Sequence, residues 1–276
     1  MGIRKSTIVV SIVILAGIVL LLYPTVSNWW NAKHQSIAIE SYVSKVEKSD
    51  ETEYIDILKE ARKYNESLVD KSLDRLRLSK KELDKYNSML KIEDSEIISV
   101  ISIPKINLRL PIYHGTDEAV LQVAIGHIPG TSLPVGGKDT HSVISGHTGL
   151  TSAKLFTDIE KLLNGDTFTL NTLNETLIYE VDQVRVVLPQ EVDDLNIDKG
   201  KDYVTLQTCT PYGVNTHRLL VRGSRINTDL SNIKVTADAI ELNSIVINIV
   251  CLIILILIFY IVKFIMILVE LLLSKR

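Results

Sequence analysis

Two long apolar segments, one near each end of the 276-residue chain, constrain its fold more than any other feature. The first runs from Ser6 to Tyr23, and eighteen helical residues rise about 27 Å, close to the thickness of the hydrocarbon core of a bilayer. Arg4 and Lys5 precede this segment, and positive charge stays on the cytoplasmic side of a membrane. The sequence therefore predicts an N-terminal transmembrane anchor over residues 1–23. A cleaved signal peptide is the alternative, although no small-residue cleavage motif follows the segment.

The second apolar segment runs from Ile245 to Leu273, and its uninterrupted core, Ile245–Val262, is again about one bilayer long. Lys263 can snorkel to the interface, and two basic residues close the chain. We therefore expect a linker and a C-terminal transmembrane helix over residues 228–276. Both termini are predicted to be cytoplasmic, with everything between the two membrane helices outside the cell.

The composition supports this topology and excludes two classes of protein. Hydrophobic residues make up 46% of the chain, too many for a disordered protein. The mean hydropathy of +0.20 is high for a soluble domain, and the excess lies at the two ends. The chain has 30 basic and 33 acidic residues and no basic stripe, so we expect no nucleic-acid partner.

Residues 24–96 are predicted to be helical and charged. Ser79 and Glu82 fit a capping box that opens a short helix. The region is expected to be a solvated stalk with one apolar stripe that packs on the next domain. The stripe keeps helical spacing at Ile55, Leu58, Ala61 and Leu68.

From residue 97 to residue 227 short β-branched runs alternate with Gly, Pro, Asn and Asp. Such spacing predicts a mainly β domain, either a sandwich or a closed barrel, with about seven or eight strands. Only two short helical pieces are expected in it, Asp117–Val123 and Asp158–Leu163. The strands are expected at Ile97–Ile103, Ile106–Leu110, Ser142–Ile144, Thr167–Asn171, Leu177–Val187, Tyr203–Thr208 and Leu219–Arg225.

Cys209 is the first candidate for chemistry, because it ends a predicted strand and is the one cysteine of the outer region. The other cysteine, Cys251, lies in the second apolar segment and cannot pair with it. A buried, inert thiol is the alternative interpretation. A nucleophilic cysteine needs a base or a cation nearby, together with a donor for the oxyanion that forms when it attacks a carbonyl.

Arg218 is a candidate for that cation. A hairpin closed by Thr210–His217 brings Arg218 beside Cys209, where a fixed guanidinium stabilises both thiolate and oxyanion. A surface ion pair is the alternative. A zinc site is disfavoured, because one cysteine with scattered histidines lacks the spacing of a zinc centre, and no cofactor is expected.

Spacing alone does not select the catalytic histidine. His147 ends a predicted strand and enters a turn. His217 stands next to Arg218 on another strand, where neighbours point to opposite faces, so His217 and Arg218 cannot both face one site. His34 is expected on a solvated surface, His114 and His127 in Gly-rich turns, and His141 at the start of a strand.

The residues around Cys209 resemble those of the sortases. Thr205–Cys209 reads TLQTC, which matches the TLxTC signature of that family. The longer run TCTPYGVNTHRLLVRG at 208–223 is similar to the class C sortases that assemble pili. Residues 97–226 carry further similar motifs, which read IPKIN at 103–107, LPIYHGT at 110–116, GTSLPVGG at 130–137, SGHTG at 145–149 and SAKLF at 152–156.

The resemblance implies an eight-stranded sortase β-barrel that acts as a cysteine transpeptidase. It implies Cys209 as nucleophile, His147 as acid and base, and Arg218 as oxyanion stabiliser. The substrate implied is an LPxTG-like sorting signal, cleaved between Thr and Gly and joined to a lysine amine of another pilin subunit. The partners implied are pilins or other surface proteins of a Gram-positive cell wall, and no metal or cofactor is required.

One departure from the class concerns the lid. Class C sortases typically carry an Asp-Pro-aromatic motif that covers the cysteine, and no such motif occurs here. Residues 69–79 occupy the corresponding place, and we expect a lid that is degenerate or absent; deletion of residues 65–79 tests whether the segment inhibits. If the segment does form a lid, Asp70 or Asp74 pairs with Arg218, and Leu73 or Leu76 covers the thiol of Cys209.

Two other functions remain open at this stage. A sortase of similar construction attaches surface proteins to a peptidoglycan-precursor amine instead of a pilin lysine. A non-catalytic, membrane-tethered β-domain is the alternative from another class, and it predicts that Cys209→Ala changes nothing beyond minor stability.

Overall fold

The computed structural model describes residues 5–227 and a few residues between Ile253 and Ile267. The predicted C-terminal transmembrane helix and its linker lie outside the described residues. The described residues fall into two compact units, one with the N-terminal residues up to Val26 and one that begins at Ser27. The second unit contains the β domain and the helices that cover it.

The long helix α1 (Lys5–Lys48) contains the first predicted membrane segment. Within the described part of the chain it is the one helix long and apolar enough to cross a membrane. Its apolar side chains are exposed, as Leu20 and Leu21 show. These features are consistent with a membrane anchor. The helix does not end at the predicted boundary but continues through Pro24.

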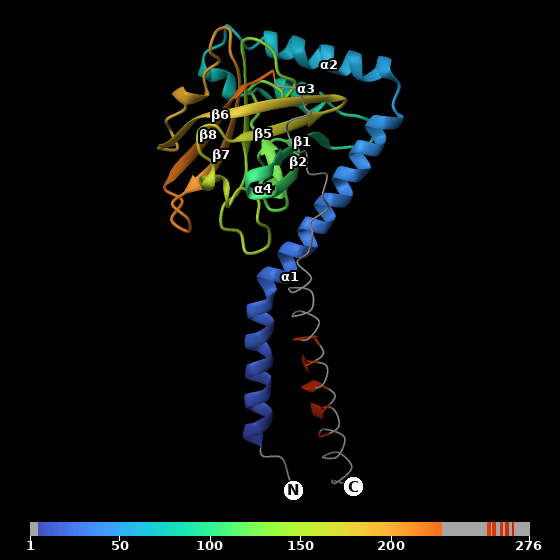
Figure 1. The fold of residues 1–276 in the computed structure, drawn as a ribbon, viewed down its shortest axis with the longest axis vertical. Helices are drawn as coiled ribbons and strands as arrows, with labels where there is room; N and C mark the ends of the chain where they lie inside the picture. The colour runs from blue at the N-terminus through green and yellow to red at the C-terminus, as the bar shows by residue number, and fades with distance from the viewer. Residues whose placement is uncertain are drawn as a thin grey trace. The chain divides into compact units, whose positions relative to one another are not determined.

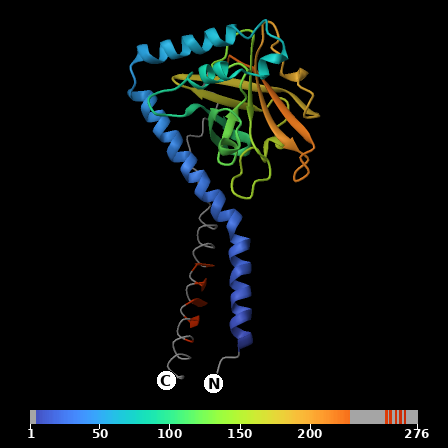
Figure 2. The same cartoon turned by 180° about the vertical axis from the view of Figure 1, so that it is seen from behind.

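Three shorter helical elements follow α1. They are α2 (Glu51–Glu66), the 3₁₀ helix η1 (Leu73–Leu76) and α3 (Lys80–Asn87). Ser79 and Glu82 form the predicted capping box of α3. Of the predicted apolar stripe, Leu58, Ala61 and Leu68 are buried in the same hydrophobic cluster as the barrel interior, whereas Ile55 is exposed. Figures 1 and 2 show α2 lying across one end of the β domain.

Eight strands form a closed barrel, as the sequence led us to expect. Their order around the barrel is β1-β2-β3-β4-β7-β8-β6-β5. Two of the neighbouring pairs are parallel, β2 with β3 and β4 with β7, and the others are antiparallel. The strands are β1 (Ile97–Ile103), β2 (Leu108–His114), β3 (Ile125–His127), β4 (Thr140–Ser145), β5 (Thr167–Thr172), β6 (Glu175–Val187), β7 (Asp202–Thr210) and β8 (His217–Arg225).

Short helical turns join several of the strands. The turn η2 (Pro104–Ile106) separates β1 from β2, α4 (Glu118–Leu121) precedes β3, η3 (Ile159–Lys161) precedes β5, and η4 (Asp193–Leu195) lies between β6 and β7. The two helical pieces expected from the sequence are thus present but shorter than predicted.

The prediction for the region around β2 and β3 was wrong in two respects. The second strand was expected at Ile106–Leu110, whereas β2 runs from Leu108 to His114. Asn107 turns the chain with a φ of 48°, which delays the strand. His114 and His127 were expected in turns, but each is the last residue of a strand.

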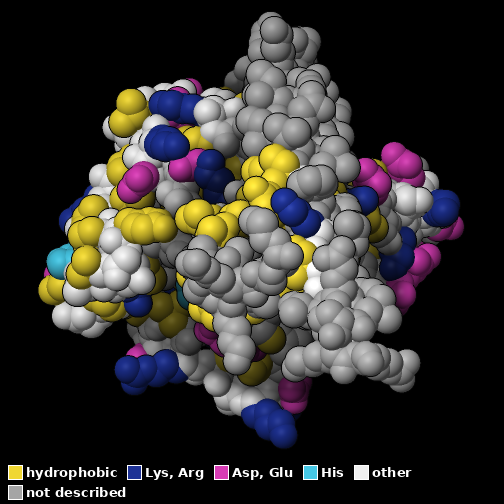
Figure 3. Space-filling view, turned by 90° about the horizontal axis from the view of Figure 1, so that it is seen from below, with side chains coloured by type: hydrophobic (Ala, Val, Ile, Leu, Met, Phe, Trp, Pro, Cys, Tyr) yellow, Lys and Arg dark blue, Asp and Glu magenta, His cyan; other side chains and the backbone are white. Residues whose placement is uncertain are grey.

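Alternation along the strands separates the interior of the barrel from its outer face. Leu206 and Leu219 point inward and belong to the main hydrophobic core. A smaller apolar cluster lies on the outer face under the connection between β6 and β7, with Val143, Leu195 and Leu220 in it. Figure 3 shows apolar, basic and acidic side chains intermingled on the face seen from below, so no single charge dominates that face.

Candidate active site

Cys209 and Arg218 share the outer face of the barrel. Cys209 is the last residue but one of β7, is half-buried and forms no disulfide. It stands three residues after the inward-pointing Leu206, and Arg218 stands next to the inward-pointing Leu219. Because side chains alternate along a strand, both Cys209 and Arg218 point outward.

The pairing of β7 with β8 sets Cys209 directly opposite Arg218. Side chains that face each other across two antiparallel strands have Cβ atoms about 4.5–5.5 Å apart. The hairpin predicted from the sequence therefore forms and brings the cation beside the thiol. Arg218 Nη1 donates to the carbonyl of His217 at 3.2 Å. Among the described residues Arg218 makes no ion pair, which leaves its charge available in the site.

His147 is held next to the end of β7 by two hydrogen bonds of its neighbour Gly146. The Gly146 N–H donates to the carbonyl of Gln207 at 3.0 Å. The hydroxyl of Thr208 donates to the carbonyl of Gly146 at 2.7 Å in a buried position. The parallel register pairs Ser145 with Gln207 at the end of β4, and His147 and Cys209 each follow two residues later along their segments.

Close packing around Gly146 fixes where the chain leaves β4. A Cβ atom at Gly146 would lie 2.7 Å from Ile125 and 2.9 Å from the ring of Phe156, so no side chain fits there. The N–H of Phe156 donates to the carbonyl of His147 at 3.0 Å. The strand end and the segment around Phe156 therefore hold His147 from two sides.

The turn after His147 also contacts the loop between β7 and β8. Gly149 has a φ of +75°, and a Cβ there would lie 2.9 Å from the ring of Tyr212. Tyr212 belongs to the loop that joins Cys209 to Arg218. The turn that follows His147 and the loop that joins Cys209 to Arg218 therefore pack against each other at one end of the barrel.

The imidazole of His147 is partly exposed and has one acidic neighbour. Its Nε2 lies 4.0 Å from a carboxylate oxygen of Glu118, the first residue of α4, which is too far for a hydrogen bond. Nε2 has no hydrogen-bond partner within the described structure. This nitrogen is buried in the described structure.

Among the other histidines, His127 and His141 are buried and His114 is half-buried, and burial lowers the pKa of all three. The pKa falls to about 4 for His114, to about 3 for His127 and to about 4 for His141. His127 accepts from the Tyr86 hydroxyl, and His141 donates to the carbonyl of Asn196. These neutral imidazoles fill structural roles.

The remaining two histidines lie on the surface. His34 donates to the carbonyl of Trp30 on α1. His217 contacts the hydroxyl of Thr216 and is paired in register with Thr210. Of the six histidines, His147 follows the end of β4, which neighbours β7 on one side, and His217 lies on β8 on the other side, opposite Thr210.

The segment that corresponds to a lid is attached elsewhere. Asn65 exchanges two hydrogen bonds with the backbone of Leu133. Arg75 is buried, and its Nη2 donates to the carbonyl of Leu195 at 2.8 Å. These contacts tie residues 65–79 to the 130–134 loop and to the connection between β6 and β7.

The contacts with the site that were considered for this segment do not form. Ser72 caps the start of η1, and Asp74 accepts a hydrogen bond from its hydroxyl instead of pairing with Arg218; Asp70 makes no ion pair in the described part of the chain. Neither Leu73 nor Leu76 takes part in the apolar clusters of the barrel. The capping motif at Ser72 and the buried Arg75 direct the segment toward its present place.

Two residues that support the site were missed from the sequence. Thr208 lies inside the signature that carries Cys209, and its role in positioning depends on a partner 62 residues away along the chain. Glu118 gave no signal, because an exposed carboxylate at a helix start is commonplace.

The barrel, with a cysteine and an arginine paired at the end of β7 and a histidine beside them, defines a cysteine transpeptidase of the sortase type. The sortase domain family matches residues 101–226. The chain is 51% identical to sortase C1 from Streptococcus agalactiae in a match that covers 70% of this chain and 99% of that one, with a TM-score of 0.66. The chain belongs to the sortase family.

Several of its relatives with solved structures are class C sortases. Sortase C-1 from Actinomyces oris is 45% identical, over 63% of this chain and 99% of that one, with a TM-score of 0.59. Sortase C from Streptococcus pneumoniae is 40% identical, over 69% and 96%, with a TM-score of 0.62. A more distant relative, sortase A from Bacillus anthracis, is 27% identical over 82% of this chain and 96% of its own length.

Proposed function

We propose that the protein is a pilin polymerase whose catalytic residues are Cys209, His147 and Arg218. The observation that carries the proposal is the pairing of Cys209 with Arg218 across β7 and β8, with Gly146, the neighbour of His147, hydrogen-bonded to the end of β7. The similarity to sortase C from Streptococcus pneumoniae, whose structure bears on pilin substrate specificity, supports pilins as the substrates.

In the first half of the reaction Cys209 attacks the carbonyl between Thr and Gly of an LPxTG-like sorting signal. The oxyanion that forms is stabilised by the guanidinium of Arg218, and His147 gives its proton to the leaving glycine amine. The product is a thioester between Cys209 and the threonine of the signal.

In the second half a lysine amine of another pilin subunit attacks the thioester. His147 accepts the proton of the amine, Cys209 leaves as thiolate, and an isopeptide bond joins the two subunits. The side chain of His147 is partly exposed, which supports its part in both proton transfers. The chain needs no metal or organic cofactor for these steps.

We further propose that α1 anchors the enzyme with its N-terminus in the cytoplasm and the barrel outside the cell. The apolar surface of α1 and the positive charges before it support this orientation. With a second transmembrane helix near the C-terminus, both ends of the chain are cytoplasmic.

The experiment that tests the function uses the full chain in an uncharged detergent, mixed with a pilin that carries an LPxTG-like signal. We expect a ladder of covalent pilin multimers on a denaturing gel and none with Cys209→Ala. A product formed only with a peptidoglycan-precursor amine would instead show an anchoring sortase. If the Cys209→Ala variant gives the same products as the unaltered chain, the catalytic assignment is overturned and a non-catalytic β-domain is favoured.

A further inference from the structure

The part of α1 that belongs to the same compact unit as the barrel begins at Ser27, and it contacts two loops of the barrel. Three amide side chains make these contacts, those of Asn28, Asn31 and Gln35. Their spacing of three and four residues puts them on one face of the helix. Each amide bonds to a backbone group, so the contacts do not depend on which side chains the loops carry.

Two of the amides hold the turn that follows His147. The Nδ2 group of Asn31 donates to the carbonyl of Ser152 at 2.8 Å in a partly buried position. The N–H of Lys154 donates to Oδ1 of Asn28, also at 2.8 Å. One amide therefore acts as donor and the other as acceptor, and together they attach the middle of the turn to α1.

The same turn is connected to the catalytic residues on its other side. The N–H of Phe156 donates to the carbonyl of His147 at 3.0 Å. The N–H of Gly149 donates to the hydroxyl of Thr157 at 3.2 Å, which closes the turn. Gly149 also lies against the ring of Tyr212 in the loop between β7 and β8. A displacement of the turn would therefore be transmitted to the backbone of His147.

The third amide reaches the segment that carries the acidic neighbour of His147. The Nε2 group of Gln35 donates to the carbonyl of Val123 at 2.6 Å. Val123 follows α4, whose first residue, Glu118, has a carboxylate oxygen 4.0 Å from Nε2 of His147. Seven residues after Gln35, Tyr42 is buried in the main hydrophobic core, which fixes this part of α1 on the barrel.

We propose that Asn31 and Gln35 are positioning residues that hold His147 in place for proton transfer. The inference rests on the proposed function, because that function assigns the proton transfers to His147. Cys209 and Arg218 are fixed to each other by their own hairpin, whereas His147 lies beyond the end of β4. A displacement of about 1 Å costs up to about 10²-fold in rate, so this support matters. The helix that carries the proposed membrane anchor thereby forms part of the support of the active site.

Variants of the full chain in an uncharged detergent test this role, and each adds one negative charge to the same helix face. Asn31→Asp and Gln35→Glu lose the N–H donor and place a carboxylate against a carbonyl oxygen. Asn28→Asp keeps the acceptor for the N–H of Lys154 and is the matched control. In the first two variants kcat for cleavage of a sorting-signal peptide should fall about tenfold while KM stays near its original value, whereas Asn28→Asp should change kcat less than about twofold.

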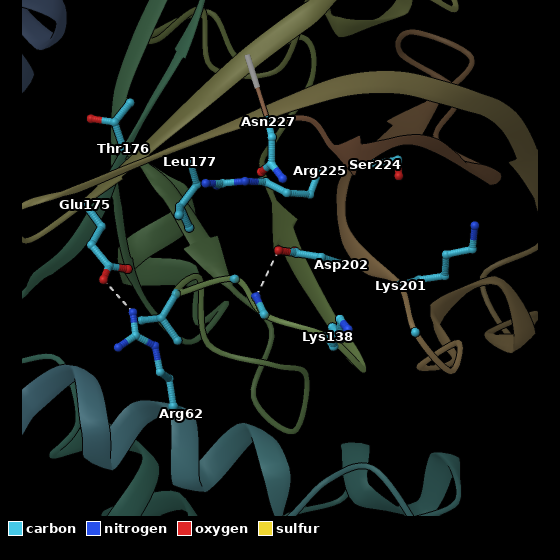
Figure 4. Close-up of a pocket in the computed structure, with 14 residues that line it drawn as sticks. Arg62, Lys138, Glu175, Thr176, Leu177, Lys201, Asp202, Ser224, Arg225 and Asn227 are labelled. Carbon is cyan, nitrogen blue, oxygen red and sulfur yellow. Dashed lines mark hydrogen bonds and ion pairs between the residues drawn. The ribbon is translucent and has the colours of Figure 1, made fainter. Parts of the chain in front are cut away.

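Arg62→Gln is the control for a contact between helix and barrel that lies away from the site. Arg62 on α2 forms an ion pair with Glu175 at the start of β6 (Figure 4). The other end of β6, at Val187, pairs with Arg218. The variant removes an exposed ion pair without touching the turn after His147, so kcat should stay unchanged.

Hydrogen exchange measured by mass spectrometry examines the turn without any substrate. Exchange of residues 148–157 should become about fivefold faster or more in Asn31→Asp and should stay unchanged in Asn28→Asp and Arg62→Gln. The proposal is overturned if Asn31→Asp keeps the kcat or the exchange rate of the unaltered chain, or if either control lowers kcat equally. If exchange changes as expected but the unaltered chain cleaves no sorting-signal peptide, the contacts of α1 are supported and the proposed function fails.

Discussion

Cys209 and Arg218 face each other as register partners on antiparallel strands, the one near the end of β7 and the other near the start of β8. A six-residue loop separates the two strands, so the hairpin alone fixes the distance between thiol and guanidinium. No other element needs to move to bring them together. The histidine, in contrast, depends on a strand from elsewhere in the chain.

Replacing Arg218 by Gln should lower kcat for cleavage of a sorting-signal peptide by about 10²–10³, the usual effect of removing one oxyanion donor. The fold should survive, because Arg218 makes only two backbone hydrogen bonds, at 3.2 and 3.5 Å. Peptide cleavage kinetics measure the effect. Arg185→Gln is the control, since it removes an exposed ion pair with Asp194 and should leave kcat unchanged. Equal activity of the two variants would remove Arg218 from the mechanism.

Thr208→Val should separate positioning of His147 from its chemistry. The substitution leaves the buried carbonyl of Gly146 without its 2.7 Å hydrogen bond, which costs about 1–3 kcal/mol in stability. The turn that carries His147 then loosens, so kcat should fall while KM stays near its original value. Thr52→Val, at an exposed position of α2, is the matched control. A Thr208→Val enzyme with normal kcat but lowered stability would limit the hydroxyl to a structural role.

Residues 65–79 should not inhibit the enzyme as a lid. Asp74→Ala should change the rate of peptide hydrolysis less than about twofold, because Asp74 contacts Ser72 and not Arg218. Arg75→Gln should instead lower stability, because Arg75 is buried and donates to the carbonyl of Leu195. Hydrolysis rates and thermal unfolding of both variants are the measurements. A tenfold rise in hydrolysis after deletion of residues 65–79 would show that the segment inhibits after all.

The sequence was sufficient to predict the hairpin of the site but not the histidine. Two strands joined by a short loop pair with each other because they are neighbours in the chain. The position of Arg218 beside Cys209 therefore followed from the length of the loop. The pairing of β4 with β7 is parallel and joins segments about 60 residues apart. No local pattern encodes such a pairing, and the selection of His147 rested on family resemblance.

The errors around β2 and β3 have the same kind of cause. The predicted strand ended at Leu110, yet Pro111 lies within β2 opposite Val100, at a position before β3 begins to pair with β2. A proline is tolerated there because its missing N–H has no partner to lose. The three-residue β3 contains Gly126, where a Cβ would overlap the carbonyl oxygen of Gly115. The backbones at Gly126 and Gly115 approach each other closely, and no sequence pattern predicts this contact.

The buried histidines should make the barrel less stable as the pH falls from 7 to 5. His114, His127 and His141 have a lowered pKa in the folded protein, whereas in the unfolded chain the pKa is about 6.5. Below pH 6.5 the unfolded chain therefore binds more protons than the folded protein, and protonation favours unfolding. This loss of stability continues until the pH reaches the folded pKa of about 4 for His141.

His141→Gln tests this linkage, because Gln keeps a donor for the carbonyl of Asn196 and an acceptor for the hydroxyl of Thr205 but does not titrate. Each buried histidine contributes a slope of about 1.4 kcal/mol per pH unit between its two pKa values. Urea unfolding of the full chain in uncharged detergent should therefore show a pH dependence shallower by about that amount in His141→Gln. His34→Gln should leave the slope as it is, since His34 is exposed on α1. A slope unchanged by His141→Gln would mean that His141 is already charged in the folded barrel, which its hydrogen bonds to a carbonyl and a hydroxyl in the interior argue against.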